Sequence, residues 1–180
     1  MRNRRKKSNK GPLPVSAPPA WCRWCAAVLI FTLPVATAQT TQEWISGNIT
    51  WDTTLPHWDN GTSWVEGNGA IFNSGAGVVL IGSDGIQASS IQFNTTAVIA
   101  DYNPDIADNN LSLTGSGNLD AASGEIGYIE STITGTNGIT VGATGDGSIL
   151  LSGANTYTGI TTVESGAWLG INDSSALGSS

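Results

Sequence analysis

Hydrophobic and polar positions alternate in short runs along most of the chain. The runs are rich in Ile, Leu, Val and Thr, and Gly, Asn or Asp stands between them where the chain has to turn. The clearest runs are 70–72, 78–81, 91–93, 97–99, 111–113, 126–129, 139–141, 149–151, 161–163 and 168–171. Outside the N-terminal segment no window shows a sustained apolar i, i+3, i+4 pattern, so the sequence predicts an all-β fold.

Two all-β architectures fit this spacing. Strands of only three to five residues favour a β-solenoid, in which each coil pairs with the coils above and below it. Long alternating strands joined by a two-residue turn would indicate hairpins, and Asn60-Gly61 and Asp84-Gly85 are the nearest candidates. We therefore expect a right-handed parallel β-solenoid, with a β-sandwich as the alternative.

The most regular part of the pattern lies in residues 147–171. Residues 151–166 read LSGANTYTGITTVESG, which closely resembles the autotransporter-associated β-strand repeat, also called the passenger-associated transport repeat, of bacterial surface proteins. The residues that carry the resemblance are Leu151, Gly153, Asn155, Tyr157, Gly159, Val163, Gly166 and Leu169. The resemblance implies a secreted surface scaffold, followed by a translocating β-barrel that these 180 residues do not include.

A packed coil makes specific demands on this repeat. The apolar side chains expected to point into the coil are Leu151, Val163 and Leu169. Gly153 and Gly159 should bracket a turn in which Asn155 bonds backbone groups, because an Asn side chain mimics a turn. The chain stops at Ser180 shortly after an Ala-Leu-Gly that leads into the next repeat in such proteins, so we expect a truncated array.

The N-terminal segment has the three parts of a secretory signal peptide. A basic stretch precedes the apolar run 26–35, and Ala36-Thr37-Ala38 follows, which predicts cleavage between Ala38 and Gln39. A membrane anchor is the alternative, but this run is shorter than the about 20 apolar residues that a spanning helix needs. Cys22 and Cys25 lie in this segment, so cleavage leaves a chain without cysteine.

Charge divides the chain and limits its partners. All seven Lys and Arg residues lie at or before Arg23, whereas all fourteen Asp and Glu residues lie from Glu43 to Asp173. Nucleic acid is excluded as a partner, because its binding depends on Lys and Arg. No cofactor is expected: Asp101-Tyr102-Asn103-Pro104-Asp105 begins like a calcium loop, but Ile106 replaces the required Gly. A calcium site of another kind at the surface stays open.

Four tryptophans stand close together near the start of the predicted mature chain. Trp44, Trp51, Trp58 and Trp64 follow one another at intervals of seven, seven and six residues. Large rings that cover the open end of a solenoid explain this density. The alternative is a platform on which sugar rings stack. The segments expected from these arguments are a signal peptide at 1–38, a Trp-rich cap at 39–72, degenerate coils at 73–146 and the repeat at 147–180.

Catalysis finds little support in the sequence. His57 is the single histidine and has no cysteine in the mature chain to activate, and no H-E-x-x-H, P-loop or G-x-S-x-G motif occurs. We expect a non-enzymatic passenger portion of an autotransporter-like surface protein, an adhesin or a stalk with a host-surface or polysaccharide ligand. A polysaccharide-active β-helix enzyme or a carbohydrate-binding module is the alternative.

Overall fold

The computed structural model describes residues 40–45, 50–73, 75–102, 109–142 and 144–179. They belong to one compact unit, Thr37–Ser180. The predicted signal peptide, its cleavage site at Ala38 and Gln39, and most of the calcium-like loop lie outside the described residues. No helix within the described ranges is long and apolar enough to cross a membrane.

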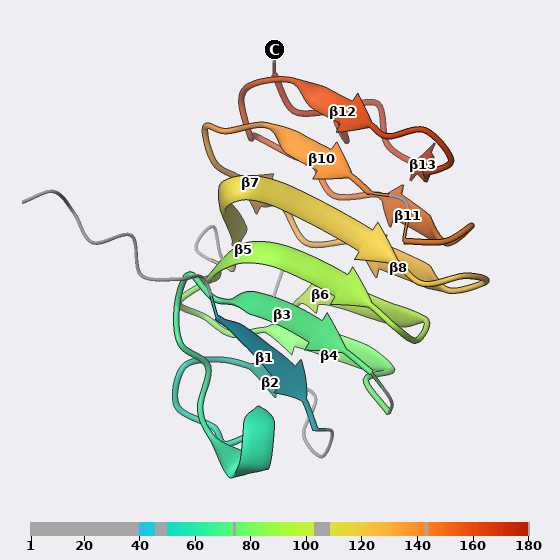
Figure 1. Ribbon diagram of the computed structural model, residues 1–180. Coiled ribbons are helices and arrows are strands. Elements are labelled where there is room, and N and C mark those ends of the chain that lie inside the picture. The colour runs from blue at the N-terminus through green and yellow to red at the C-terminus, as the bar shows by residue number, and fades with distance from the viewer. Residues whose placement is uncertain (1–39, 46–49, 74, 103–108, 143, 180) are drawn as a thin grey trace, which may run out of the picture. The chain divides into compact units, whose positions relative to one another are not determined.

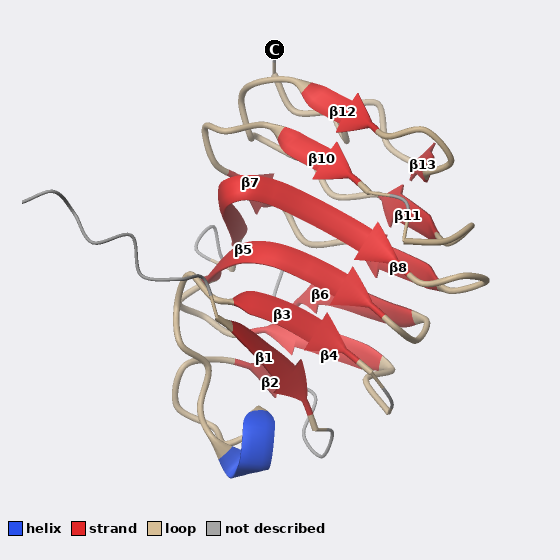
Figure 2. Ribbon diagram, viewed as in Figure 1, coloured by secondary structure: helices blue, strands red, loops and turns tan. Residues whose placement is uncertain are grey.

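Strands dominate the described part of the chain, and a short 3-10 helix lies near its beginning (Figure 2). The elements are β1 Thr41–Trp44, β2 Thr50–Trp51, η1 Asp59–Gly61, β3 Gly69–Phe72, β4 Val78–Ile81, β5 Ile86–Phe93, β6 Ala97–Asp101, β7 Leu111–Ala121, β8 Ile126–Ile129, β9 Ile133–Thr134, β10 Ile139–Val141, β11 Ser148–Leu151, β12 Thr161–Val163 and β13 Trp168–Ile171.

The strands form two parallel sheets. The first has the order β1-β3-β5-β7-β10-β12, with β9 also paired to β7, and the second has the order β13-β11-β8-β6-β4-β2. Strands of the first sheet run left to right in front in Figure 1, and those of the second return behind them as the chain climbs, which is a right-handed winding. The predicted all-β parallel solenoid is confirmed, and the antiparallel sandwich is excluded.

Matching register stacks like residues from coil to coil. In the second sheet Val79, Ile99, Ile129 and Leu151 follow one another as pairing partners, and each is fully buried. In the first sheet Ala70, Ile91, Leu119 and Val141 form a corresponding buried row. Because alternate residues of a strand point to opposite faces, these rows place one apolar face of each sheet against the other. The core is therefore a thin apolar stack between the two sheets.

The four tryptophans fill the end of this core. They lie beside the terminal strands β1 and β2 and are between 0% and 3% exposed. The ring centroids of Trp58 and Trp64 are 4.6 Å apart, and those of Trp51 and Trp64 are 5.0 Å apart. Rings buried in this way cannot stack on a sugar from solvent. The boundaries 39–72 of the cap stay a prediction.

Two strands are longer than the expected three to five residues. Strand β5 has 8 residues and β7 has 11, and the pairing register shifts between Ala88 and Ser90. The residues of β7 opposite this shift include Gly115 and Gly117, which have φ values of 63° and 57°. Such left-handed backbone favours glycine and lets a strand turn a corner. Each long strand is thus two short strands joined through a bend.

Candidate functional site

A polar hollow of about 340 Å³ opens where three strands of the second sheet end. Residues Trp51, Ile81 and Asp101 are register partners at the ends of β2, β4 and β6. The residues that line the hollow include Thr50, Asp52, Gly82, Ser83, Asp84 and Tyr102. We call this site the Gly82 hollow.

The hollow is built from equivalent positions on successive coils. Asp52, Gly82 and Tyr102 each follow one of the three register partners. The backbone keeps them in step, since Gly82 N donates to Trp51 O at 3.0 Å and Tyr102 N donates to Ile81 O at 3.2 Å. A carboxylate and an aromatic ring thus flank a position that has no side chain.

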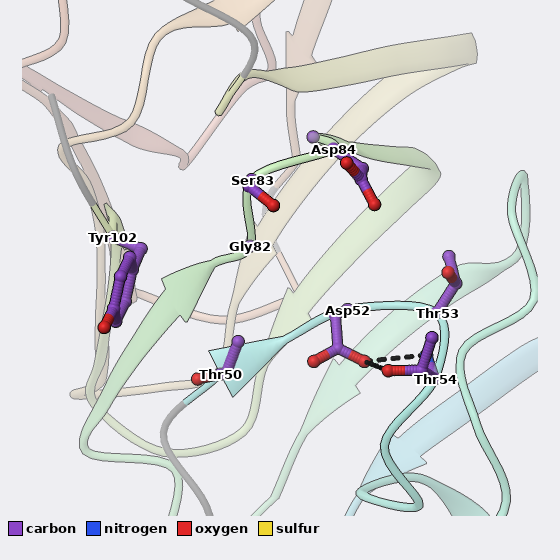
Figure 3. A pocket seen from close by; sticks show the side chains of 9 residues that line it. Thr50, Asp52, Thr53, Thr54, Gly82, Ser83, Asp84 and Tyr102 are labelled. Atoms are coloured by element: carbon purple, nitrogen blue, oxygen red, sulfur yellow. Dashed lines mark hydrogen bonds between the residues drawn. The ribbon is translucent and has the colours of Figure 1, made fainter. Parts of the chain in front are cut away.

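Asp52 is held by the turn that follows it. Its Oδ1 accepts hydrogen bonds from Thr54 N at 2.7 Å and Thr54 Oγ1 at 2.8 Å (Figure 3). It also accepts a hydrogen bond from Leu55 N at 2.7 Å. Burial raises the pKa of Asp52, but the hydrogen bonds from Leu55 and Thr54 outweigh it and hold the pKa below its usual value. The carboxylate is therefore charged at neutral pH. Its second oxygen points to the side of the hollow where Thr50 and Tyr102 lie (Figure 3).

The other walls of the hollow are exposed. Tyr102 is 63% exposed, and its ring stands across the hollow from Thr53 and Thr54 (Figure 3). Ser83 and Asp84 are exposed on the turn between β4 and β5. The chain has no Lys or Arg after Arg23 to neutralise these carboxylates. The hollow therefore offers oxygen acceptors, hydroxyl groups and an aromatic face to a ligand.

The candidates for catalysis and calcium binding lie elsewhere. His57 packs against Trp44, with ring centroids 5.5 Å apart, and its Nε2 has no partner among the described residues. Asp101 occupies the row of Trp51 and Ile81, and burial raises the pKa of its carboxyl group. In the part of the chain that the structure describes, no three His, Cys, Asp or Glu side chains are grouped to hold a metal.

The repeat residues form one coil and its contacts with the next. Leu151 is fully buried between its register partners Ile129 and Ile171. Tyr157 is 1% exposed, and its hydroxyl lies 2.6 Å from Thr161 Oγ1. Asn155 Oδ1 accepts from Ile133 N at 2.7 Å, and its Nδ2 donates to Ala176 O at 2.6 Å. Both amide atoms of Asn155 thus bond backbone groups of neighbouring coils.

Glycine is required at different positions of the repeat for different physical reasons. Gly159 and Gly166 adopt φ values of 103° and 91°, which favour glycine. Gly153 is needed for space, since a Cβ atom there would meet the backbone of Ser131.

Val163 lies on the inward face of its coil but is not buried. Its register partner is Val141, which is 1% exposed, so Val163 lies on the inward face. Val163 itself is 46% exposed, because β12 is the last strand of its sheet and no further described strand covers it. Leu169 is partly buried and packs against the core.

An apolar groove of about 240 Å³ lies on the second sheet beside β8, β11 and β13. Its lining includes Tyr128, Leu150 and Trp168, and Trp168 is 67% exposed. Sequence reasoning did not single out this groove or the Gly82 hollow. The residues of each come from different coils and are joined only by strand register, so no local motif marks them.

Comparison with known proteins identifies one relative. Over 143 residues, or 73% of this chain, the sequence is 34% identical to the "Adhesin BmaC autotransporter" of Brucella suis biovar 1 (strain 1330). The match covers 4% of the length of that adhesin, so the chain spans only a small part of it. No protein-family model matches the chain, and no solved structure matches it. The similarity supports a relationship with autotransporters.

Proposed function

We propose that the chain is an exported, non-enzymatic β-solenoid scaffold that forms part of the passenger of an autotransporter-like surface protein and acts in adhesion. The observation that carries this proposal is the 34% identity to an autotransporter adhesin over 143 residues. The parallel solenoid adds physical support, since it presents a loop from every coil along one rigid stack.

The composition of the predicted mature chain suits export to the cell surface. Residues 39–180 contain no cysteine. A chain that crosses a membrane pore unfolded would be obstructed by early disulfides, which form in oxidising compartments. The same residues contain no Lys or Arg, which keeps the surface acidic and soluble.

The remaining parts of the proposal concern boundaries and family. Cleavage between Ala38 and Gln39 removes a signal peptide, and residues 39–72 cap the first coil. Residues 73–146 form degenerate coils, and residues 147–180 form an autotransporter-associated β-strand repeat. The resemblance of residues 151–166 to that repeat supports this assignment.

Adhesion of the bacterium that produces the chain tests the proposal. A strain from which codons 39–180 are deleted in frame should adhere less to epithelial monolayers than its parent, and the restored gene should recover adhesion. Purified chain added to the parent should compete with the cells for the same surface. Unchanged adhesion in the deletion strain, with the rest of the protein still displayed, contradicts the adhesive role.

Enzymatic action is tested on the same material. Prolonged incubation of the purified chain with host polysaccharides should release no fragments. Release of fragments that is lost when a single Asp or Glu is replaced would contradict the non-enzymatic scaffold.

A further inference from the structure

We propose that the Gly82 hollow binds a saccharide that carries no acidic group. This inference deepens the proposed adhesive function, on which it rests for access to glycans at a surface. It specifies where on the solenoid the adhesive ligand binds and to which chemical class that ligand belongs.

The spacing of the coils gives the hollow the width of a sugar ring. Neighbouring parallel strands lie about 4.8 Å apart, so the rows of Asp52 and Tyr102, two coils apart, are separated by about 10 Å. Gly82 occupies the row between them, and a Cβ atom there would already lie 3.2 Å from Asp52 Cβ. The row of Gly82 therefore adds no side chain between Asp52 and Tyr102. A larger residue at this position would fill the site.

Tyr102 supplies the apolar surface that sugar recognition uses. Its side chain is 63% exposed on the outer face, so the ring is accessible from solvent. A tyrosine ring offers an apolar face together with a hydroxyl group. The C–H face of a pyranose can lie on this ring while the sugar hydroxyls remain free for polar groups. The ring therefore needs no rearrangement to receive a ligand.

The polar groups of the hollow match the hydroxyls of a sugar. The second oxygen of Asp52 points into the hollow, and Asp84 and Ser83 lie on the neighbouring turn (Figure 3). Carboxylates accept strong hydrogen bonds from hydroxyl donors. Asp52 is preset by the hydrogen bonds that Thr54 and Leu55 donate to its other oxygen. The hollow therefore presents a charged hydrogen-bond acceptor whose position is fixed before a ligand binds.

Charge excludes acidic ligands. Two carboxylates, Asp52 and Asp84, line the hollow, and the chain has no Lys or Arg beyond Arg23. A uronic acid, a sialic acid or a phosphate would be repelled, because nothing near the site compensates its charge. The hollow also supplies too few ligands for a divalent cation. Calcium takes six to eight oxygen ligands. No third His, Cys, Asp or Glu among the described residues is grouped with Asp52 and Asp84. An uncharged sugar meets no such repulsion, and it can use the carboxylate acceptors and the Tyr102 ring together.

Calorimetric titration of the purified full chain tests the site. The probes are maltotriose, mannotriose and triacetylchitotriose as neutral sugars, trigalacturonic acid as an acidic sugar, and calcium chloride alone. We expect at least one neutral trisaccharide to bind with a millimolar or lower Kd and the acidic sugar not to bind. Tyr102→Ala should weaken that binding at least about tenfold. Tyr102→Phe, which keeps the ring, should retain it.

Matched control variants distinguish binding at the Gly82 hollow from general effects of a substitution on binding. Asp84→Asn should weaken binding of the same trisaccharide, whereas Glu164→Gln, directly after strand β12 of the first sheet, should not change its Kd. Tyr128→Ala removes an aromatic side chain from the other groove and serves as the ring control. Tyr102, Asp84 and Glu164 are exposed, so these variants should fold as the parent does, and circular dichroism checks this.

Several results would overturn the inference. These are the absence of binding by all three neutral trisaccharides, binding that Tyr102→Ala and Asp84→Asn leave unchanged, equal binding of the acidic sugar, and binding that EDTA abolishes. Failure here with adhesion still dependent on residues 39–180 would leave the adhesive role standing. Binding of a neutral sugar by a chain whose deletion does not alter adhesion would contradict the adhesive role and not the site.

Discussion

At the scale of single residues, Asn155 shows how a buried polar side chain can join neighbouring coils. Asn155 is 6% exposed, yet it bonds the backbone of Ile133 on one side and of Ala176 on the other. An unpaired buried donor or acceptor costs free energy, so a residue with two bonds to separate coils joins those coils. The turn chemistry of Asn predicted that the side chain of Asn155 bonds backbone groups. It did not reveal that the bonds run between coils.

Replacement of Asn155 should therefore loosen the last coils. Asn155→Ala leaves Ile133 N and Ala176 O without their partners, and we expect a loss of about 1–3 kcal/mol in the free energy of unfolding. Asn172 is exposed and provides the control. Asn172→Ala should change stability by less than about 0.5 kcal/mol. Urea denaturation measures both, and equal effects of the two substitutions would contradict this role of Asn155.

The carboxyl group of Asp101 makes the stability of the folded protein depend on pH. Burial raises the pKa of its carboxyl group in the folded state. The folded protein thus holds this proton more tightly than the unfolded chain, and the resulting stability is present at low pH and lost as pH rises through the folded pKa. Asp101→Asn should raise the melting temperature at pH 7. The gain should vanish near about pH 3, where the carboxyl is protonated in both states.

Thermal melts of Asp101→Asn and the parent across this pH range measure the difference. The other titratable groups are the same in both proteins, so their contributions cancel in the difference between the two melting temperatures. A gain that stays constant from pH 7 to the acid end would show that charge at Asp101 is not its cause.

At the scale of strands, small and large residues from the two sheets complement each other. Gly127 of β8 is an inward position between Ala97 and Ile149, and a Cβ atom there would collide with the ring of Phe93 from β5. The two sheets are thus held at a distance set by this pair. Since protein cores are close-packed, neither residue can change size alone without cost.

Gly127→Ala should destabilise the protein by about 1–3 kcal/mol through overpacking. Phe93→Leu alone should also destabilise it, because it leaves a void. The double substitution should cost less than the sum of the two, since the smaller side chain makes room for the methyl group. A double-mutant cycle by chemical denaturation measures the coupling, and strictly additive losses would show that the two residues do not meet.

The strands show which features of the fold can be predicted from the sequence alone. The alternating runs 78–81, 126–129 and 168–171 coincide with β4, β8 and β13, because an inward apolar row has to repeat in every coil. The length of β7 was not foreseen, since a glycine corner that continues a strand reads like a turn that ends it. The Gly82 hollow was missed for a different reason. Asp52, Gly82 and Tyr102 become neighbours only through register, which alternation does not specify.

At the scale of the whole molecule, each coil contacts mainly the coils on either side of it. Stability in such an array is a sum over interfaces, so damage to one coil should remain local. The two ends of the described stack differ. The tryptophan rings fill the end at β1 and β2, whereas Val163, Trp168 and Ile171 are exposed on the terminal strands β12 and β13. The C-terminal coils should be the first to open.

Leu151→Asp should unfold those coils while the tryptophan cluster stays intact. It places a carboxylate between Ile129 and Ile171, and an unpaired buried charge costs several kcal/mol. Exposed Glu164→Gln should be tolerated, with a change below about 0.5 kcal/mol. Limited proteolysis with chymotrypsin should cut Leu151→Asp early near Tyr157 and Trp168 and spare Trp51 and Trp58. Simultaneous cutting at all four positions would contradict local unfolding.

Display on the cell surface is the central claim, and protease treatment of intact cells tests it most directly. Residues 39–180 contain no Lys or Arg, so trypsin cannot cut within them and chymotrypsin is the enzyme to use. Mass spectrometry of the supernatant should find peptides from 39–180, with Gln39 as the most N-terminal residue and no peptide from 1–38. Peptides from 39–180 that appear only after the cells are lysed would contradict the account.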